Sequence, residues 1–274
     1  MGKELYQTMP KAKGLLDDAC ELLGYDLRRL MFEGPEEKLK ETQYAQPAIY
    51  VCSAMYLEKA KEMGLSYEYV AGHSLGEYAA LYAAGIFSFL DGLTLIHKRG
   101  RAMGAENETG TMAAVLGMTK EELKPILDAR TDVVMANLNT KTQIVISGTE
   151  RGIDEVAEIV AEKEEVQVKR LAVSAPFHSP QMAKASEIMK KEIERMEFKA
   201  PKVFVVPNVT GKLTKDVGEI KRGLISQITG QVLWYDSVLA MKEEGVEQYY
   251  EIGNGSVLRR MNKGITLRPK CFSL

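Results

Sequence analysis

The segment Gly72-His73-Ser74-Leu75-Gly76 fits the pattern Gly-x-Ser-x-Gly. This pattern is typical of a nucleophile elbow, a sharp turn between a strand and a helix that exposes the serine hydroxyl. Tyr69 to Ala71 is a short β-prone run before the motif, and Tyr78 to Ala84 has helical character after it. A tight turn around a buried serine could have the same Gly-x-Ser-x-Gly pattern, but the strand–turn–helix context favours a nucleophile at Ser74.

A serine hydroxyl is a weak nucleophile unless a base reaches it, and the chain has only three histidines. His73 adjoins Ser74 and is predicted to line the pocket or to order the turn. His97 falls inside a predicted helix and is expected to be packed or exposed. His178 lies in Ala175-Pro176-Phe177-His178-Ser179-Pro180, a loop that follows a strand, and such loops present catalytic groups. We therefore predict His178 as the general base. The alternative is a histidine in the capping region of the following helix, without a catalytic role.

Arg99 interrupts the apolar face of a helix predicted over Phe89 to Met103. Counting by three and four places it with Leu95, Ile96, Ala102 and Met103. A guanidinium among apolar groups is costly without an anionic partner, and its planar fork suits a carboxylate. The partner is either an internal Asp or Glu or the carboxylate of a substrate, and the helix pattern alone does not decide between them.

The elements that must position these residues change character along the chain. Before the elbow, the pattern predicts helices over Gly2 to Leu23 and Pro47 to Met63. The middle of the chain predicts the order strand, helix, strand, strand, helix, strand, which is the ferredoxin-like βαββαβ arrangement. Its segments are Met112 to Gly117, Lys120 to Ala129, Val133 to Asn137, Gln143 to Ser147, Gly152 to Lys163 and Val166 to Val173.

After Pro176, helices and strands alternate again, which predicts a mostly parallel sheet. The segments are Pro180 to Glu197, Val203 to Val206, Trp234 to Glu244 and Gln248 to Ile252. We therefore predict an α/β protein in which residues 1–110 and 175–274 form the core and residues 111–174 form an inserted ferredoxin-like subdomain.

Composition excludes several classes of protein. A net charge of -2 over 274 residues argues against a nucleic-acid-binding role. The three cysteines, Cys20, Cys52 and Cys271, have no metal-site spacing and are too few for a disulfide framework, so a reducing cytoplasm is expected. No apolar run reaches the ~20 residues that a membrane span needs. We expect a cytoplasmic protein with no membrane or nucleic-acid partner.

The elbow is one of five ordered segments. The others are Lys98-Arg99-Gly100, then Ala136-Asn137-Leu138-Asn139 before Gln143 to Gly148, then Ala175 to Ser179, and finally Glu251-Ile252-Gly253. In this order and spacing, from about Lys3 to Lys263, the chain resembles malonyl-CoA:acyl-carrier-protein transacylase, the acyltransferase family of fatty-acid and polyketide synthesis. The resemblance implies an α/β-hydrolase-like core with a ferredoxin-like insert.

The resemblance also implies a substrate, a partner and a mechanism. Malonyl-CoA would be the substrate and acyl carrier protein the partner. We also expect no cofactor, no metal and a monomer. Ser74 would carry the malonyl group, and His178 would act as base and later as acid. Gln227 matches the family residue whose backbone carbonyl orients that histidine, and Arg99 would bind the malonyl carboxylate.

Further positions follow from the same resemblance. Phe177 and Leu75 match members that select malonyl groups, because bulk there disfavours a methyl branch. Asn137 and Asn139 match a stretch near the site, in which a ligand role and a loop role are both open. A cluster of basic residues after His178 could dock the acidic carrier protein, although an ordinary solvated helix face is the simpler interpretation; it comprises Lys184, Lys190, Lys191 and Arg195.

The start of the chain departs from the family pattern. The family opens with a strand followed by Gly-Gln-Gly-Ser-Gln, whose glutamine amide serves the oxyanion hole, whereas this sequence begins Met1-Gly2-Lys3-Glu4-Leu5. We therefore expect the amide of Leu75 to be the remaining donor, and a gap or exposed edge in the parallel sheet. Two alternatives stay open: a catalytically weak homologue that binds carrier protein or CoA, and a serine thioesterase or hydrolase.

Overall fold

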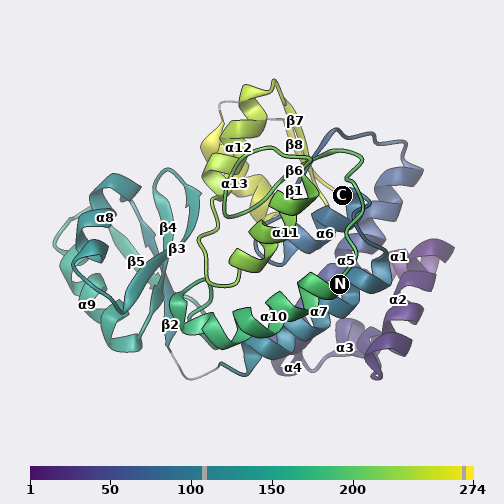
Figure 1. Ribbon diagram of the computed structural model, residues 1–274, viewed down its shortest axis with the longest axis horizontal. Helices are drawn as coiled ribbons and strands as arrows, with labels where there is room; N and C mark the ends of the chain where they lie inside the picture. The colour runs from purple at the N-terminus through teal and green to yellow at the C-terminus, as the bar shows by residue number, and fades with distance from the viewer. Residues whose placement is uncertain (107–109, 267–269) are drawn as a thin grey trace.

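The computed structural model describes residues 1–106, 110–266 and 270–274 (Figure 1). The predicted core, residues 1–110 and 175–274, therefore includes six residues, 107–109 and 267–269, that lie outside the described part. Within the described ranges, no helix has the length and apolar character needed to cross a membrane.

Helices make up the chain before the elbow. They are α1 (Lys3–Thr8), α2 (Pro10–Leu23), α3 (Leu27–Glu33), α4 (Glu36–Lys40) and α5 (Thr42–Glu62). The single helix predicted over Gly2 to Leu23 is divided at Met9, which has an extended backbone, and Pro10 then begins α2. The short helices α3 and α4 were not predicted, because neither is long enough to show a helical period.

The elbow joins β1 (Tyr69–Ala71) to α6 (Gly76–Ala83), and α7 (Phe89–Gly104) follows. The prediction of α7 is confirmed almost to the residue. Ser88 and Asp91 form a reciprocal capping box at its start, with the Asp91 amide donating to Ser88 Oγ at 3.1 Å. Helices α5 and α7 pack with α2 and α10 (Ala183–Arg195) in the largest apolar core, which includes Leu16, Met55, Ile96 and Met189.

The middle of the chain forms a four-stranded antiparallel sheet in the order β3-β4-β2-β5. Its elements follow the predicted sequence of strand, helix, strand, strand, helix, strand. They are β2 (Thr111–Leu116), α8 (Lys120–Asp128), β3 (Val133–Thr140), β4 (Gln143–Gly148), α9 (Glu150–Ala161) and β5 (Gln167–Arg170). This part has its own apolar core, and in Figure 1 it lies to one side of the remaining elements.

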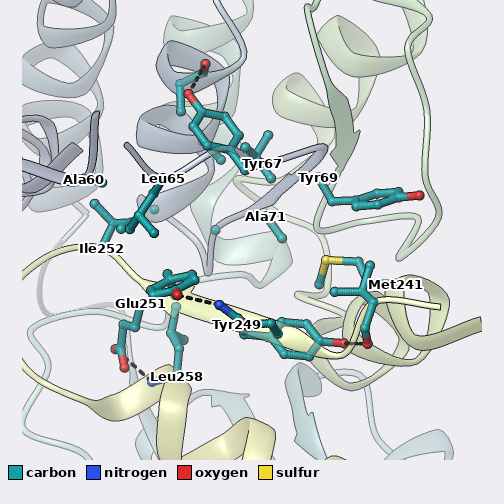
Figure 2. A pocket seen from close by; sticks show the side chains of 18 of the residues that line it. Ala60, Leu65, Tyr67, Tyr69, Ala71, Met241, Tyr249, Glu251, Ile252 and Leu258 are labelled. Atoms are coloured by element: carbon teal, nitrogen blue, oxygen red, sulfur yellow. Dashed lines mark hydrogen bonds between the residues drawn. The ribbon is translucent and has the colours of Figure 1, made fainter. Parts of the chain in front are cut away.

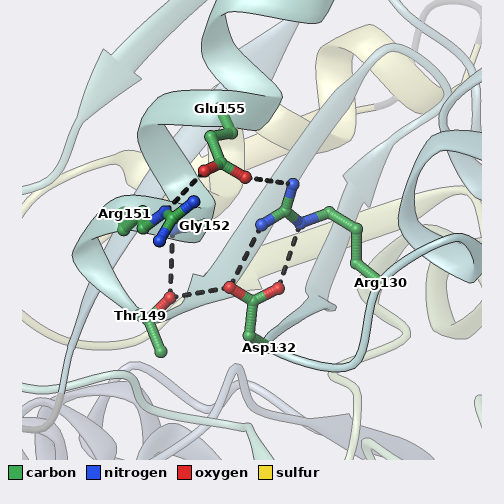
Figure 3. A network of polar contacts seen from close by, with 6 residues as sticks. All are labelled: Arg130, Asp132, Thr149, Arg151, Gly152 and Glu155. Carbon is green, nitrogen blue, oxygen red and sulfur yellow. Dashed lines mark hydrogen bonds and ion pairs between the residues drawn. The ribbon is translucent and has the colours of Figure 1, made fainter.

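A polar network fixes the outer end of this sheet (Figure 3). Arg130 donates to both carboxylate oxygens of Asp132, at 3.0 and 3.1 Å, and pairs with Glu155 at 2.7 Å. The Thr149 hydroxyl donates to Asp132 at 2.9 Å and caps α9 by accepting from the Gly152 amide at 3.0 Å. The network therefore ties the loop before β3 to the start of α9.

The strands of the remaining α/β part are parallel, as predicted, but they form two separate pairs rather than one sheet within the described residues. β1 pairs with β6 (Phe204–Val206), and β7 (Gln248–Glu251) pairs with β8 (Lys270–Ser273). The helices around them are a short 3-10 turn (Pro180–Met182), α10, α11 (Val217–Ser226), α12 (Trp234–Glu243) and α13 (Val257–Ile265). A mixed α/β architecture is thus confirmed.

Candidate active site

Ser74 lies between β1 and α6 with φ of 52°, a left-handed conformation that is unusual for a residue other than glycine. Gly72 makes this turn possible, because a Cβ there would come within 2.0 Å of the Gly76 carbonyl oxygen. A Cβ on Gly76, by contrast, would meet open space. The side chain of Asn208, just beyond β6, holds the turn by accepting from the Ser74 amide at 2.7 Å and donating to the Gly72 carbonyl at 2.6 Å.

The structure brings together Ser74, His178 and Gln227, which are far apart in the sequence. His178 Nδ1 lies 2.8 Å from the backbone carbonyl of Gln227, which can only accept, so Nδ1 carries the proton. His178 Nε2 lies 2.7 Å from Ser74 Oγ and is therefore free to accept the serine proton. The predicted serine–histidine pair and its backbone orienting group thus have the geometry that proton abstraction requires.

The surroundings of His178 keep its ring neutral. The residue has φ of 58° in the loop between Pro176 and Pro180 and is only 4 % exposed. Burial, together with the nearby Arg99 guanidinium, lowers the pKa of His178 to about 3. The imidazole is therefore unprotonated, as a base must be, over the physiological range.

Arg99 points its guanidinium at the serine from α7 and is 1 % exposed. Its Nη2 donates to Ser74 Oγ at 3.1 Å and to Gln227 Oε1 at 3.1 Å, while Nη1 donates to Gln46 Oε1 at 2.6 Å. The guanidinium carbon, Cζ, of Arg99 lies 5.7 Å from the centre of the Tyr78 ring. None of the ion pairs formed among the described residues includes Arg99, and burial lowers its pKa. The guanidinium is thus a buried cation beside the nucleophile, and no carboxylate of the described residues forms an ion pair with it.

Beneath the serine, Glu77 is fully buried and organises the groups that hold it. Its Oε2 accepts from the Gln227 side-chain amide at 2.7 Å and from the Asn208 backbone amide at 3.1 Å. Gln227 Nε2 also reaches the Ser74 carbonyl oxygen at 2.9 Å. Burial raises the pKa of Glu77 to about 7, partly opposed by these hydrogen bonds and by Arg99.

The remaining predicted residues surround this centre at different depths. His73 Nε2 is 2.8 Å from Asn139 Oδ1, and its ring lies 6.0 Å from that of Trp234. Asn137 is also buried, and its backbone forms an isolated parallel β-bridge with Val232. His73 and Asn139 therefore connect the elbow to the antiparallel sheet.

Phe177 and Leu75 are half-buried and flank the pair formed by His178 and Ser74 in sequence. The Leu75 amide stands at the N-terminus of α6, and within the described ranges it has no main-chain acceptor. His97 lies half-buried in α7 and takes no part in the hydrogen bonds around Ser74. No group of three or more metal-ligating side chains is found in residues 1–106, 110–266 and 270–274.

Three polar residues of the site were missed from the sequence: Gln46, Glu77 and Asn208. Asn208 follows a strand, in the position where parallel-sheet proteins present functional groups, and that signal could have identified it. Gln46 and Glu77 lie among apolar neighbours in the helices α5 and α6. Buried polar residues on an apolar helix face were a usable signal there, as they were for Arg99.

A strained serine at a strand–turn–helix junction, bonded to a histidine that a backbone carbonyl orients, is the arrangement of enzymes that form an acyl ester on serine. Comparison with known proteins narrows this class. A family model described as the acyl transferase domain matches residues 1–219. The chain belongs to this acyltransferase family, and the resemblance noted from the sequence is confirmed.

Individual relatives match nearly the whole chain. The malonyl CoA-acyl carrier protein transacylase of Bacillus subtilis is 41% identical over 280 residues, covering 100% of this chain and 88% of that protein. A protein of the same name from Synechocystis is 37% identical, covering 96% of this chain and 88% of its own length. The crystal structure of the Synechocystis malonyl-CoA:ACP transacylase has a TM-score of 0.93 at 35% identity and covers 100% of this chain and 92% of its own.

Proposed function

We propose that this acyltransferase moves a malonyl group from malonyl-CoA to the phosphopantetheine thiol of an acyl carrier protein, through an ester on Ser74. Relatives whose names state this activity match nearly all of the chain. The observation that carries the proposal is the buried guanidinium of Arg99, 3.1 Å from Ser74 Oγ. A carboxylated acyl group on the serine would give this cation its anionic partner.

In the first half-reaction, His178 Nε2 takes the hydroxyl proton while Ser74 Oγ attacks the thioester carbonyl. The tetrahedral oxyanion forms beside the amide of Leu75, at the positive end of α6. When the carbon–sulfur bond breaks, the CoA sulfur leaves with the proton from His178. In the second half-reaction, His178 takes the proton of the carrier thiol, whose sulfur attacks the malonyl ester, and Ser74 regains the proton as it leaves.

The carboxylate of malonyl would also help the base. Arg99 is the second cause, after burial, of the low pKa of His178. A carboxylate paired with Arg99 would offset this charge and raise the pKa of His178 at the moment when the histidine must accept a proton. Acyl groups without a carboxylate would lack this assistance.

The other predicted residues take supporting roles in this proposal. The Gln227 carbonyl orients His178, and Phe177 with Leu75 limits bulk near the malonyl α-carbon. His73 lines the substrate pocket, held by Asn139, and Asn137 supports that strand through its neighbour Val232.

We also propose the domain organisation expected from the sequence. Residues 1–110 and 175–274 would form an α/β-hydrolase-like core, and residues 111–174 a ferredoxin-like subdomain. The strand order β3-β4-β2-β5 and the separate apolar core of that sheet support this division.

The test is to incubate the purified chain with malonyl-CoA and to measure its intact mass. We expect a malonyl adduct on Ser74 that disappears when holo acyl carrier protein is added, with malonyl appearing on the carrier. Absence of the adduct in the wild-type chain would refute the proposal, and release of free malonate without transfer would assign a hydrolase instead.

Substitution of Arg99 tests the carboxylate role separately. Because a charge-assisted hydrogen bond contributes about 1.5–3 kcal/mol, Arg99→Ala should reduce malonyl loading on the order of a hundredfold and acetyl loading much less. Lys98→Ala is the matched control, since Lys98 lies on the same helix but pairs at the surface with Glu192. Equal losses of malonyl and acetyl loading would remove Arg99 from this role.

A further inference from the structure

The side chain of Gln227 makes contacts that are separate from the backbone carbonyl that orients His178. Its Nε2 donates to the Ser74 carbonyl oxygen at 2.9 Å, and its Oε1 accepts from Arg99 Nη2 at 3.1 Å. A carbonyl oxygen can only accept and a guanidinium can only donate, so these two contacts fix which end of the amide is which. The Gln227 side chain therefore joins the nucleophile elbow to Arg99.

Glu77, from α6, holds this amide in place. Its Oε2 accepts from Gln227 Nε2 at 2.7 Å and from the Asn208 backbone amide at 3.1 Å. The amide nitrogen of Gln227 has two hydrogens, and the Ser74 carbonyl and Glu77 use both of them. A further acceptor, Asn208 Oδ1, lies 3.4 Å from this nitrogen, so loss of Glu77 would leave only a long contact in its place.

The carboxyl of Glu77 is buried against protein groups and not against the neighbouring cavity. Figure 2 shows this cavity of about 730 Å³, to whose lining Ala71 and Tyr249 belong. Helix α6 lines it with Gly76 and Ala79, whereas Glu77 is not among its lining residues and is fully buried. The Glu77 carboxyl is thus directed toward the groups around the nucleophile.

Two glutamines hold the guanidinium of Arg99 at different nitrogens. Gln46 accepts from Nη1 at 2.6 Å, and Gln227 accepts from Nη2 at 3.1 Å. Because the guanidinium is planar and rigid, two acceptors on different nitrogens fix its orientation. Nη2 also reaches Ser74 Oγ at 3.1 Å, and Nε is buried with no hydrogen-bond partner among the described residues. In this orientation, Nε and Nη2 can bind a carboxylate carried by Ser74.

We propose that Glu77 is a positioning residue that sets the preference for carboxylated acyl groups, because it fixes the Gln227 side chain that orients Arg99 toward Ser74. This inference rests on the malonyl transfer proposed above. Glu77 forms no ion pair with Arg99, so the hydrogen-bonded path between them runs through the amide of Gln227. An acyl group without a carboxylate does not need Arg99 and should be affected much less.

The first test compares malonyl and acetyl loading of Ser74 in two variants of Glu77. Glu77→Ala should slow malonyl loading about tenfold and acetyl loading less than about threefold, since it removes a buried acceptor but leaves the Gln227 backbone carbonyl on His178. Glu77→Gln should restore malonyl loading to within about threefold of the wild type, because an amide oxygen accepts the same bonds. Equal losses of malonyl and acetyl loading in Glu77→Ala would overturn the proposal. A loss in Glu77→Gln as large as in Glu77→Ala would also overturn it, because the charge of Glu77 and not its hydrogen bond would then be responsible.

A double substitution tests whether Glu77 acts through Gln227. Gln227→Leu removes the side-chain amide and keeps the backbone carbonyl, and it should lower the ratio of malonyl to acetyl loading as Glu77→Ala does. Adding Glu77→Ala to Gln227→Leu should lower this ratio no further. Losses that multiply in the double variant would overturn the proposal, because Glu77 would then act by a route that does not include Gln227.

Leu81→Val is the matched control for a purely structural effect. Leu81 is fully buried on the same helix as Glu77 but belongs to the apolar core. Its substitution should lower the midpoint of thermal unfolding and leave the ratio of malonyl to acetyl loading unchanged. If that ratio fell as it does in Glu77→Ala, the preference would follow stability and the proposal would be wrong.

A measurement on the free protein tests the positioning without any acyl transfer. Nitrogen NMR of the arginine side chains reports how fast the Arg99 guanidinium rotates. We expect slow rotation in the wild type and in Glu77→Gln, and rotation about tenfold faster in Glu77→Ala, where Gln227 is no longer fixed. Equal rotation rates in all three would overturn the proposal. A wild-type chain that forms no malonyl adduct would instead refute the proposed function, and the rotation of Arg99 would still decide whether Glu77 positions it.

Discussion

Glu77 allows a quantitative test of how the site is built, because its carboxyl is buried under Ser74 and carries an altered pKa. Burial raises the pKa of Glu77 to about 7 from an ordinary value of 4.5. The folded protein therefore holds this proton more tightly than the unfolded chain does. The stability contributed by Glu77 is fully present below about pH 4.5 and is lost as the pH rises to about 7.

The magnitude follows from that interval. At about 1.4 kcal/mol per pKa unit, the free energy of unfolding falls by about 3 kcal/mol over this interval, and most of the fall occurs above about pH 5. Glu77→Gln removes the titration but keeps an amide oxygen that can accept from Gln227 and Asn208. The free energy of unfolding of the variant, relative to the wild type, should therefore rise by about 2.5 kcal/mol between about pH 5 and pH 8.

Urea unfolding of both proteins across this pH range measures the difference directly. Contributions from the histidines are common to both proteins and cancel. Glu158→Gln, on the exposed face of α9, controls for the loss of a carboxylate. Parallel stability curves for the wild type and Glu77→Gln would refute the reasoning, because they would mean that Glu77 ionises in the folded protein as it does in the unfolded chain.

Three further outcomes are expected. Gly72→Ala should destabilise the protein by about 3 kcal/mol or more in urea unfolding, because the new Cβ collides with the Gly76 carbonyl. Gly76→Ala should be neutral or stabilising by up to about 1 kcal/mol, because a Cβ there meets open space. Similar effects of the two changes would contradict the elbow geometry. Asn208→Ala should cost about 2–3 kcal/mol in the same assay, since it removes buried hydrogen bonds to Gly72 and Ser74; a loss below about 0.5 kcal/mol would show that the turn holds without it. The ring of His178 should stay neutral until the pH falls well below 6.5, toward about 3, as observed by nitrogen NMR of the imidazole; a titration near 6.5 would mean that the ring is hydrated.

The sequence predicted the reacting groups better than their support. Ser74 could be found because an elbow needs a fixed local pattern, and His178 because prolines place it in a loop after a strand. Arg99 could be found because a cation on an apolar helix face is rare. Gln227 came only from the family resemblance, since its role depends on a backbone carbonyl, which every residue possesses.

The parts that could not be predicted depend on contacts between distant segments. The position of Asn208 after a strand marks it as a candidate, but its hydrogen bond to the amide of Ser74 joins segments that are far apart in the sequence. The polar character of Glu77 on an apolar helix is visible in the sequence, but its hydrogen bonds with Gln227 and Asn208 depend on how α6 packs against the rest of the core. The short helices α3 and α4 escaped prediction for a different reason, because their lengths give too few turns for an apolar period to emerge. The break at Met9 had a local signal in Pro10, since a proline disfavours helical backbone at the residue before it.

The contacts of β3 bear on attempts to exchange parts between related enzymes. Main-chain bonds at 2.8 Å join Leu138 to Val232 and Val232 to Ala136, and these would survive most changes of side chain. The bond between Asn139 and His73 would not, because it needs a particular amide and a particular ring. A transplanted antiparallel sheet would therefore dock in the right place yet leave the histidine beside the nucleophile without its partner, unless both residues were transferred together.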